Sequence, residues 1–494
     1  MTAPCSVCVC TPEAVPYVKT GGLADVSGTL PRALSDLGCD VRIVLPGYRA
    51  IDRAAFHFRP IGGGEIPLGA SHTEVRWLES RLPGTAIPVY LVEEDAAFDR
   101  PGLYGDGDVD YPDNLRRFTV FGRGALALLR HLGWGPDVLH CQDWQTALLP
   151  VWLRVEPRDR VLAGTATLLT IHNLAYQGVF PRDALPVTGL PWEFFTPGGI
   201  EFFGLVNLLK GGLICADLLS TVSEQYAREI QTEEFGCGLD GVVRNRARDL
   251  VGILNGVDYS VWDPSHDAFI PARYTREDLA GKTVCKTHLQ RTRGLRVDPD
   301  APLLGVISRL VDQKGLDLVA AVADALLGLG AQLSVLGLGD PRYHALFEEL
   351  HQRHPDRAAF RLGYDDALAH QIEAGADIYL MPSRFEPSGL SQLYSLRYGT
   401  VPVVRRTGGL ADTIVDATPD AVARDAANGF VFDAYTPDAF LDAAKRAIFA
   451  WREPPLWRRL QSVGMGQDFS WGRAAARYLD AYQRAIAARR AAVH

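Results

Sequence analysis

Two cations that lie five residues apart indicate a candidate anion-binding loop in the second half of this 494-residue chain. Arg309 and Lys314 stand in GVISRLVDQKGLD (305–317), after an expected strand and at the start of an expected helix. Open α/β sheets bind ligands at the carboxyl ends of their strands. Two cations beside a helix N-terminus can bind a diphosphate and offset the charge that develops on it as it leaves. The alternative is a pair of solvated surface charges.

The hexapeptide TGGLAD occurs twice, at 20–25 and at 407–412. Each copy stands between an apolar strand and a helical pattern, so its glycines are expected at a helix N-terminus. Unpaired backbone N–H groups and the helix dipole favour anionic oxygens there. Lys19 precedes the first copy and adds a mobile point charge suited to phosphate. The alternative is a pair of helix-starting turns without a ligand.

A carboxylate follows another expected strand in the second half. Glu386 lies in RFEPSGLSQ (384–392), at the head of an expected helix. A carboxylate in that place can receive sugar hydroxyls, or it can simply cap the helix.

Polar residues also follow two expected strands in the first half. Asp143 follows one of them, and His172 and Asn173 follow the next. Because the carboxyl ends of parallel strands meet at one edge of a sheet, these side chains could line the same cleft. Spacing alone assigns no role to His140 or His172, since a lone histidine is more often structural.

The elements that must position these residues follow one pattern. Short apolar runs alternate with helical stretches along almost the whole chain, which is typical of βαβ units and parallel sheets. The expected strands of the first half are 6–10, 40–45, 87–91, 138–140, 167–171 and 218–222. Those of the second half are 303–307, 332–336, 360–362, 378–381, 401–404 and 429–432. The sequence therefore predicts two doubly wound α/β domains in series.

The two expected domains have approximate limits. We expect the first over 1–248 and the second over 249–468. The last segment, 469–494, contains one amphipathic helix that is expected to pack back on the first domain.

The composition excludes several classes of protein. Apolar residues make up 47% and charged residues 22%, and 50 Lys and Arg against 59 Asp and Glu give a net charge of −9. No sequence-wide basic field is therefore available to hold a nucleic acid. No apolar run reaches the ~18 to 20 residues that span a bilayer. The N-terminus does not resemble a signal peptide. We expect a cytoplasmic protein that binds neither nucleic acid nor membrane.

Two nucleotide-binding fingerprints and a zinc pattern are missing. GxxxxGK[ST] does not occur, and GxGxxG does not follow the first strand, which disfavours a hydride-transfer enzyme. The eight cysteines are scattered, and the CxxC of Cys5 and Cys8 has no second pair at zinc spacing.

Taken together, the motifs resemble those of bacterial glycogen synthases and plant starch synthases. The resemblance extends from Glu13 to the C-terminal helix and so covers effectively the whole chain. The matching segments, in order, are KTGGL (19–23), HNLAYQG (172–178), LNGVD (254–258), SRLVDQKGLD (308–317), RFEPSGL (384–390) and RRTGGLAD (405–412).

The resemblance implies a fold and a reaction. The fold is α/β of the GT-B architecture, with two Rossmann-like doubly wound domains facing a deep interdomain cleft. The reaction is transfer of glucose from ADP-glucose to the non-reducing 4-hydroxyl of an α-1,4-glucan, glycogen or a malto-oligosaccharide, with retention of configuration. No metal or other cofactor is expected, because arginine, lysine and helix dipoles take the place of a cation.

The resemblance also implies roles for single residues, position by position. Catalytic roles are implied for Arg309, Lys314, Glu386, His172 and Asp143. Contacts with the donor are implied for Lys19, Gly21, Gly22, Asn255, Tyr364, Gly389, Leu390, Gly408 and Gly409. The acceptor side is implied for Glu13, Tyr111 and Asn114. Tyr364 would stack on adenine, and the main-chain carbonyl of His172 would stabilise the oxocarbenium-like centre.

The sequence departs from the family pattern at two positions. Ser388 stands where the family often has cysteine, and we expect activity to survive because serine keeps the size and a hydroxyl. Related retaining families carry a second glutamate eight positions after the first, where this chain has Tyr394. Only one acid is therefore assigned to this loop.

Alternative functions differ in donor or in class. UDP-glucose shares the diphosphate and the sugar of ADP-glucose, so the same fold could use it. A catalytically silent glucan-binding protein would be expected to lose Lys19, Arg309, Lys314 or Glu386, and all four are present. A phosphorylase would be expected to be much longer.

Overall fold

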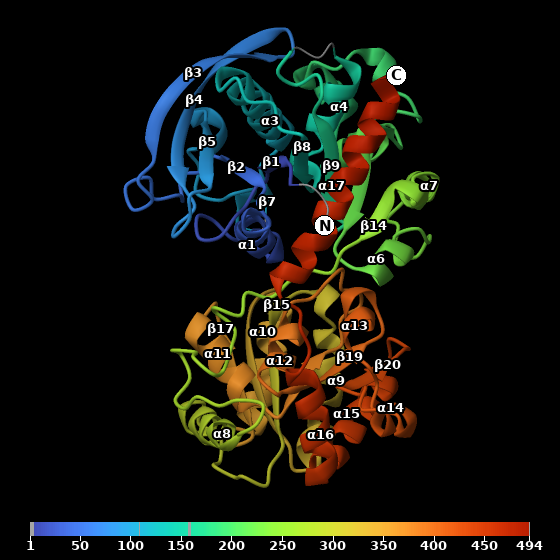
Figure 1. Cartoon of the computed structure of the whole chain (residues 1–494). Helices are drawn as coiled ribbons and strands as arrows, with labels where there is room; N and C mark the ends of the chain where they lie inside the picture. Colours follow the sequence, from blue (N-terminus) through green and yellow to red (C-terminus); the bar gives the residue numbers. More distant parts are fainter. Residues whose placement is uncertain (1–3, 108, 157–159, 494) are drawn as a thin grey trace. The chain divides into compact units, whose positions relative to one another are not determined.

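The structure is a computed structural model that describes residues 4–107, 109–156 and 160–493. The chain forms two compact units (Figure 1). Unit 1 takes the described residues up to Gly256 and from Trp471 onward, and unit 2 takes Val257–Ser470. The expected boundary after residue 248 falls inside unit 1, because strand β14 (Leu250–Gly252) pairs with β13 (Leu218–Thr221) in that unit's sheet.

A nine-stranded sheet forms the centre of unit 1, in the order β14-β13-β9-β8-β1-β2-β5-β4-β3. Only β4 runs antiparallel to its neighbours among these strands. The remaining strands are β1 (Ser6–Cys10), β2 (Asp40–Pro46), β3 (Arg59–Leu68), β4 (Ser71–Arg81), β5 (Pro88–Glu93), β8 (Val138–Gln142) and β9 (Ala166–Ile171). Because β2 and β5 lie on one side of β1 and the later parallel strands on the other, the strand order reverses between β1 and β8.

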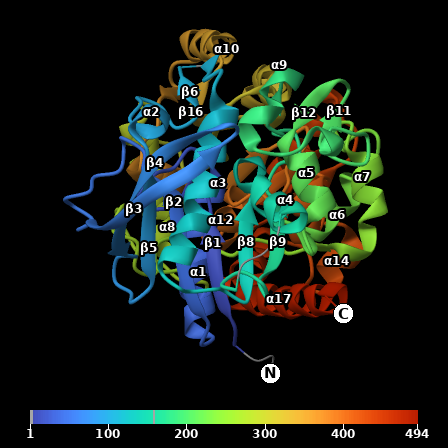
Figure 2. The same cartoon turned by 90° about the horizontal axis from the view of Figure 1, so that it is seen from above.

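Helices cover both faces of this sheet (Figure 2). Alternate residues of β1 belong to different apolar clusters: Val7 and Val9 pack with the cluster of the first and last helices, and Cys8 and Cys10 with the cluster of the middle helices. The helices are α1 (Gly22–Asp36), α2 (Asp95–Phe98), α3 (Asn114–His131), α4 (Leu148–Val155), α5 (Leu208–Cys215), α6 (Glu224–Glu229), α7 (Asp240–Asn245) and α17 (Trp471–Val493).

Short elements complete unit 1. The two-residue strands β6 (Gly105–Asp106) and β7 (Val109–Asp110) pair with each other. A separate small sheet contains β10 (Val179–Phe180), β12 (Leu205–Asn207) and β11 (Glu201–Phe202). Four 3₁₀ turns are η1 (Trp144–Thr146), η2 (Arg182–Thr188), η3 (Trp192–Phe194) and η4 (Ala247–Asp249).

The C-terminal helix α17, red in Figure 1, belongs to unit 1. It packs on α1 and along β8 and β9. Small buried residues such as Ala475, Ala481 and Ala485 allow this close approach, and Tyr478 and Tyr482 are buried between them. One long amphipathic helix thus closes the face of the sheet that α1 covers only in part.

Unit 2 is a six-stranded parallel sheet in the order β17-β16-β15-β18-β19-β20. Its strands are β15 (Leu303–Leu310), β16 (Gln332–Gly339), β17 (Ala358–Leu362), β18 (Ile378–Met381), β19 (Val401–Arg405) and β20 (Phe430–Phe432). The order reverses between β15 and β18, which is the crevice where doubly wound sheets bind ligands.

Nine helices and one 3₁₀ turn accompany this sheet in the described residues. They are α8 (Ala280–Thr292), η5 (Asp312–Lys314), α9 (Leu316–Gly328), α10 (Pro341–Arg353), α11 (Asp366–Gly375), α12 (Ser391–Arg397), α13 (Gly408–Thr413), α14 (Pro419–Ala423), α15 (Pro437–Trp451) and α16 (Pro454–Met465). The prediction of doubly wound α/β organisation is confirmed in both units.

The sequence pattern did not predict one large element. Strands β3 and β4 form a long hairpin at the edge of the unit 1 sheet, and the hairpin bends over α3 (Figures 1 and 2). Gly62, Gly63 and Gly64 make the segment look like a loop, because glycine has low strand propensity. Pairing with β4 holds it as a strand. A 3.1 Å hydrogen bond from Trp77 Nε1 of β4 to the Gly124 carbonyl attaches the hairpin to α3.

The packing of α17 generates a stability prediction. Ala485 is fully buried against unit 1, so Ala485→Leu should lower the free energy of unfolding by about 1–3 kcal/mol through overpacking. Ala488 is exposed on the same helix, and Ala488→Leu should change the free energy of unfolding by less than about 0.5 kcal/mol. Denaturant unfolding of the full chain measures both. Equal shifts in the two variants would contradict this packing.

Candidate active site

Unit 2 brings a lysine and a glutamate together where its strand order reverses. The loop after β15 carries Lys314 and the loop after β18 carries Glu386, and Lys314 Nζ lies 2.7 Å from Glu386 Oε2. Ser383 Oγ donates a hydrogen bond of 2.9 Å to the same oxygen. Glu386 is buried, and these two donors compensate its charge. Its other oxygen, Oε1, accepts no hydrogen bond from a residue that the structure describes.

Backbone contacts hold these two loops in place. The Arg384 N–H donates to the Gln313 carbonyl at 2.8 Å, and Gln313 Nε2 donates to the Phe385 carbonyl at 3.2 Å. Gly315 has φ +69°, and a Cβ there would lie 2.0 Å from the Pro382 carbonyl oxygen. Only glycine therefore lets the Lys314 loop approach the Glu386 loop so closely.

Arg309 is the second cation expected in this place. Its side chain is exposed near the end of β15, and it makes no side-chain hydrogen bond or ion pair with residues in the described part of the chain. The two cations therefore differ in their contacts. Lys314 is engaged by a buried carboxylate, whereas Arg309 is available to an anion.

The second TGGLAD copy does not leave its helix start open as expected. The Gly409 N–H donates to the carbonyls of Glu386 and Pro387, at 3.1 and 3.2 Å. A Cβ on Gly408 or Gly409 would lie 1.9 Å from a carbonyl oxygen of the 386–388 loop. The two glycines therefore let α13 pack directly against the loop that carries Glu386.

The amides of Gly389 and Leu390 lie at the start of α12. Both residues are half-buried, and neither amide donates a hydrogen bond to the described residues. Gly389 has φ +68°, a conformation that favours glycine. The expected contact of these two N–H groups with a bound sugar stays a prediction.

Three further residues of unit 2 bear on the expectations. Tyr364 is 77% exposed, and its hydroxyl donates to Asp366 Oδ1 at 3.3 Å. Ser388 is buried, and its hydroxyl finds no partner among the described residues. Tyr394 stacks on Trp262 with ring centroids 4.0 Å apart, so an aromatic stack occupies the position of the second acid in related families.

In unit 1, Glu13 occupies the start of α1. Its carboxylate accepts hydrogen bonds from the Thr20 N–H, from Thr20 Oγ1 at 2.6 Å and from the Gly21 N–H at 3.4 Å. Tyr104, which the motifs did not single out, donates to Glu13 Oε1 at 2.5 Å. The chain's own buried carboxylate thus binds amides that were expected to meet a ligand.

The cation of the first motif is held by the same motif. Lys19 Nζ lies 2.8 Å from Asp25 Oδ1, and the lysine side chain keeps 40% exposure. Gly22 begins α1 directly after the amides bound by Glu13. Asp25 therefore directs Lys19 along the start of the helix.

Asn114 and Tyr111, expected on the acceptor side, hold the loop that carries Tyr104. Asn114 is buried, and its Nδ2 donates to the Tyr104 carbonyl at 2.9 Å. Arg117 donates to Asn114 Oδ1 at 2.7 Å, and the same guanidinium lies over the Tyr111 ring at 4.8 Å. The Tyr111 hydroxyl accepts a 3.2 Å bond from the Gly102 N–H.

Asp143 links the ends of β8 and β9. It adopts φ +56°, which is rare for a residue other than glycine. Its Oδ1 accepts a 2.7 Å bond from the His172 N–H. Burial raises the pKa of Asp143 to about 7, against the opposing effect of the N–H groups of His172 and Asn173. The carboxylate thereby orients the main chain at His172.

His172 is itself held from the side by Gln142. Its Nε2 lies 2.6 Å from Gln142 Oε1, and burial lowers the pKa of the imidazole to about 3. His140 is fully buried and bonds to Tyr482 and Thr170. Asn255, expected at the donor, is buried in unit 1 with its Oδ1 unpaired among the described residues.

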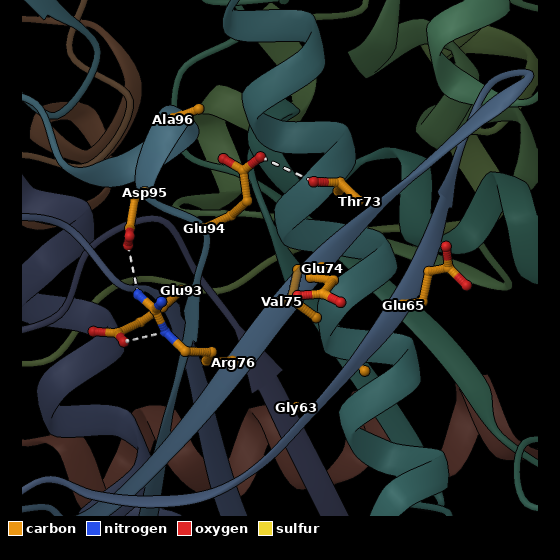
Figure 3. A pocket seen from close by; sticks show the side chains of 11 residues that line it. Gly63, Glu65, Thr73, Glu74, Val75, Arg76, Glu93, Glu94, Asp95 and Ala96 are labelled. Atoms are coloured by element: carbon orange, nitrogen blue, oxygen red, sulfur yellow. Dashed lines mark hydrogen bonds and ion pairs between the residues drawn. The ribbon is translucent and has the colours of Figure 1, made fainter.

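Among the expected residues, the structure joins Lys314 to Glu386 in unit 2. In unit 1 it joins Glu13 to Gly21, and Asp143 to His172. A separate hollow of about 630 Å³ opens between the β3–β4 hairpin and α2 (Figure 3). There Arg76 pairs with Asp95 at 2.5 Å and Thr73 donates to Glu94 at 3.1 Å. No residue singled out by the motifs lines it, so it lies apart from the candidate site.

The described residues show neither a metal-binding cluster nor a membrane-spanning helix. No group of three or more His, Cys, Asp and Glu side chains is placed to hold a metal ion. Within the same residues, no helix has the length and apolar character needed to cross a membrane.

Family models match both halves of the chain. The model for the starch synthase catalytic domain matches residues 6–245, and the model for glycosyl transferases group 1 matches residues 291–453. A glycogen synthase from Anaeromyxobacter dehalogenans (strain 2CP-C) is 52% identical over 95% of this chain and 98% of its own length. Glycogen synthase 1 from Methylococcus capsulatus is 47% identical over 96% of this chain and 95% of its own length.

Solved structures agree with these relatives. The catalytic domain of starch synthase IV from Arabidopsis thaliana, bound to ADP and acarbose, matches with a TM-score of 0.91 and 33% identity over 98% of this chain and 100% of that one. Sucrose-phosphate synthase from Thermosynechococcus elongatus matches at 16% identity with a TM-score of 0.61, which shows the fold alone. The resemblance seen in the motifs and the GT-B fold class are confirmed.

The burial of Asp143 generates a pH prediction. Because its pKa of about 7 lies above the ordinary value near 4, its contribution to stability is fully present below about pH 4 and is lost as the pH rises through 7. Wild type should therefore lose more unfolding free energy than Asp143→Asn between pH 4 and 8. Denaturant unfolding across this range measures the difference, and parallel pH curves would contradict the titration.

Proposed function

The chain belongs to the family of glycogen and starch synthases, and from this premise we propose that it transfers glucose from ADP-glucose to the non-reducing 4-hydroxyl of an α-1,4-glucan, with retention. The observation that carries the proposal is the pairing of Lys314 with buried Glu386, where the loops after β15 and β18 meet. Starch synthase IV bound to ADP and acarbose supports a nucleoside diphosphate and an oligosaccharide as ligand classes.

Unit 2 supplies the groups for the donor. Arg309 and Lys314 bind the diphosphate and stabilise the charge on ADP as it departs, because preorganised cations act most strongly where charge develops. Glu386 accepts a glucose hydroxyl at its free Oε1, while Lys314 and Ser383 hold its Oε2. The amides of Gly389 and Leu390 donate to the same sugar. Tyr364 offers its exposed ring to adenine.

The departing phosphate acts as the base in this proposal. It removes the proton from the incoming glucan hydroxyl on the face from which it leaves, so the configuration is retained. The main-chain carbonyl of His172, oriented by Asp143, stabilises the oxocarbenium-like centre. Tyr394 stacks on Trp262 and supplies no carboxylate nucleophile. No metal has a role in the proposed step, because Arg309 and Lys314 provide the positive charge.

Unit 1 supplies the remaining contacts. Lys19 contacts the donor, with Gly21 and Gly22 close to it although the Gly21 N–H already bonds to Glu13. Asn255 offers an unpaired buried oxygen to a hydroxyl. Glu13 and its partner Tyr104 lie on the acceptor side. A cytoplasmic location is part of the proposal, and it is supported by eight cysteines that are all free thiols.

Glucose transfer to glycogen tests the proposal, with radiolabelled ADP-glucose and UDP-glucose assayed side by side. Strong incorporation from ADP-glucose alone is expected. A preference for UDP-glucose would keep the fold and the reaction but overturn the donor. No transfer from either nucleotide, with glucan still bound, would identify a silent binding protein.

Loss of one cation should separate chemistry from binding. Lys314→Ala should lower kcat by ~10² or more, because it removes a preorganised charge at the leaving group. Arg424→Ala is the control, since Arg424 is exposed just after α14 and, among the described residues, forms its ion pair with Asp420 of that helix. Steady-state kinetics with ADP-glucose measure both variants. A change confined to KM would contradict the leaving-group role.

A further inference from the structure

A continuous line of hydrogen bonds crosses unit 1 from the C-terminal helix to His172. The Tyr482 hydroxyl lies 2.9 Å from His140 Nδ1, and the two residues are 342 positions apart in the sequence. His140 Nε2 lies 3.1 Å from Gln142 Nε2. Gln142 Oε1 in turn lies 2.6 Å from His172 Nε2. Four side chains from three elements are thus joined end to end.

Burial isolates this line from water. Tyr482, His140 and Gln142 have no exposed surface, whereas His172 is half-buried. Burial also lowers the pKa of both imidazoles to about 3. Each ring is therefore neutral near pH 7 and carries one proton, and its neighbours decide which nitrogen holds it.

The donors around His140 determine its tautomer. Gln142 Nε2 is a donor only, so His140 Nε2 must present its lone pair to it. The Thr170 hydroxyl lies 2.6 Å from the same nitrogen. The proton of His140 is consequently on Nδ1, and it is donated to the Tyr482 oxygen.

The oxygen of the Gln142 side-chain amide determines the tautomer of His172. Gln142 Oε1 is an acceptor only, so His172 Nε2 carries the proton that bonds to it. Its Nδ1 therefore keeps a lone pair, and that nitrogen bonds to none of the residues that the structure describes. A neutral ring in this state can accept a hydrogen bond from a hydroxyl.

We propose that Tyr482, acting through His140 and Gln142, positions the proton of His172 on Nε2, so that Nδ1 accepts a hydrogen bond from a substrate hydroxyl. The inference rests on the proposed function, which places His172 against the sugar. Tyr482, His140 and Gln142 are positioning residues, because they act on the substrate only through His172.

The proposal predicts how the line responds to the loss of one atom. Without the Tyr482 hydroxyl, the proton of His140 can move to Nε2, where it opposes the N–H₂ group of Gln142. Rotation of the Gln142 side-chain amide separates these two facing donors. It turns the N–H₂ group toward His172. The proton of His172 then moves to Nδ1, and a donor replaces the acceptor that faces the sugar.

Two matched variants on α17 test this response. Tyr482→Phe keeps the buried ring and should lower kcat on the order of 10-fold, with KM for ADP-glucose changed much less. Tyr478→Phe is the control. The Tyr478 ring also packs on His140, with ring centroids 5.4 Å apart, but the Tyr478 hydroxyl makes no bond to the imidazole. Equal kcat values in the two variants would overturn the proposal.

Nitrogen NMR of ¹⁵N-histidine-labelled protein reads the tautomer without any transfer reaction, with His172→Asn used for assignment. His172 should show a protonated Nε2 and a bare Nδ1 in wild type, and the reverse in Tyr482→Phe. A tautomer unchanged by Tyr482→Phe would overturn the inference. A response to Tyr482→Phe in a protein that transfers no glucose would support the positioning and refute only the proposed function.

A double variant tests whether Tyr482 acts through Gln142. Gln142→Leu breaks the contact with His172 directly, so adding Tyr482→Phe to it should lower kcat no further. Two independent structural effects would instead multiply, as expected for uncoupled sites. Multiplied losses would overturn the proposal.

Discussion

Burying a carboxylate is costly unless donors satisfy its oxygens, and this constraint organises the strand ends of both units. Glu386 takes Lys314 and Ser383 as donors and thereby joins the loops after β15 and β18. Glu13 takes the amides of Thr20 and Gly21 and joins the loop after β1 to the start of α1. In unit 2 the acid thus joins the two loops on either side of the reversal of strand order, and in unit 1 it fixes the connection from β1 to α1.

The repeated hexapeptide illustrates how one local sequence serves two tertiary settings. Both copies begin a helix, and the first N–H groups of a helix need an oxygen acceptor. In the first copy the acceptor is the Glu13 carboxylate, and in the second it is the main chain of the Glu386 loop. The glycines matter in the second copy because a side chain at Gly408 or Gly409 would collide with that loop. The motif therefore anchors each helix to the chain itself as well as placing it near a ligand.

The C-terminal helix ties stability to the site in unit 1. Its small residues bring it against α1 and the sheet, and its Tyr482 reaches the one polar ring buried in β8. His140 is a satisfied structural histidine by burial and bonding. It is also the link through which the last helix reaches His172, and no local pattern around His140 could have indicated a partner 342 positions away.

The sequence by itself determined the doubly wound class, most strands and the Lys314 and Glu386 loops that meet in unit 2, because periodicity and strand-end motifs are local features. Expected limits such as 378–381 coincide with β18 (Ile378–Met381). Tertiary structure decided the rest. Pairing with β4 made a strand of the glycine-rich β3, and packing placed Tyr104 against Glu13. Which amides are already bonded, and which nitrogen of His172 holds a proton, depend on donors and acceptors from distant segments, and only folding brings those together.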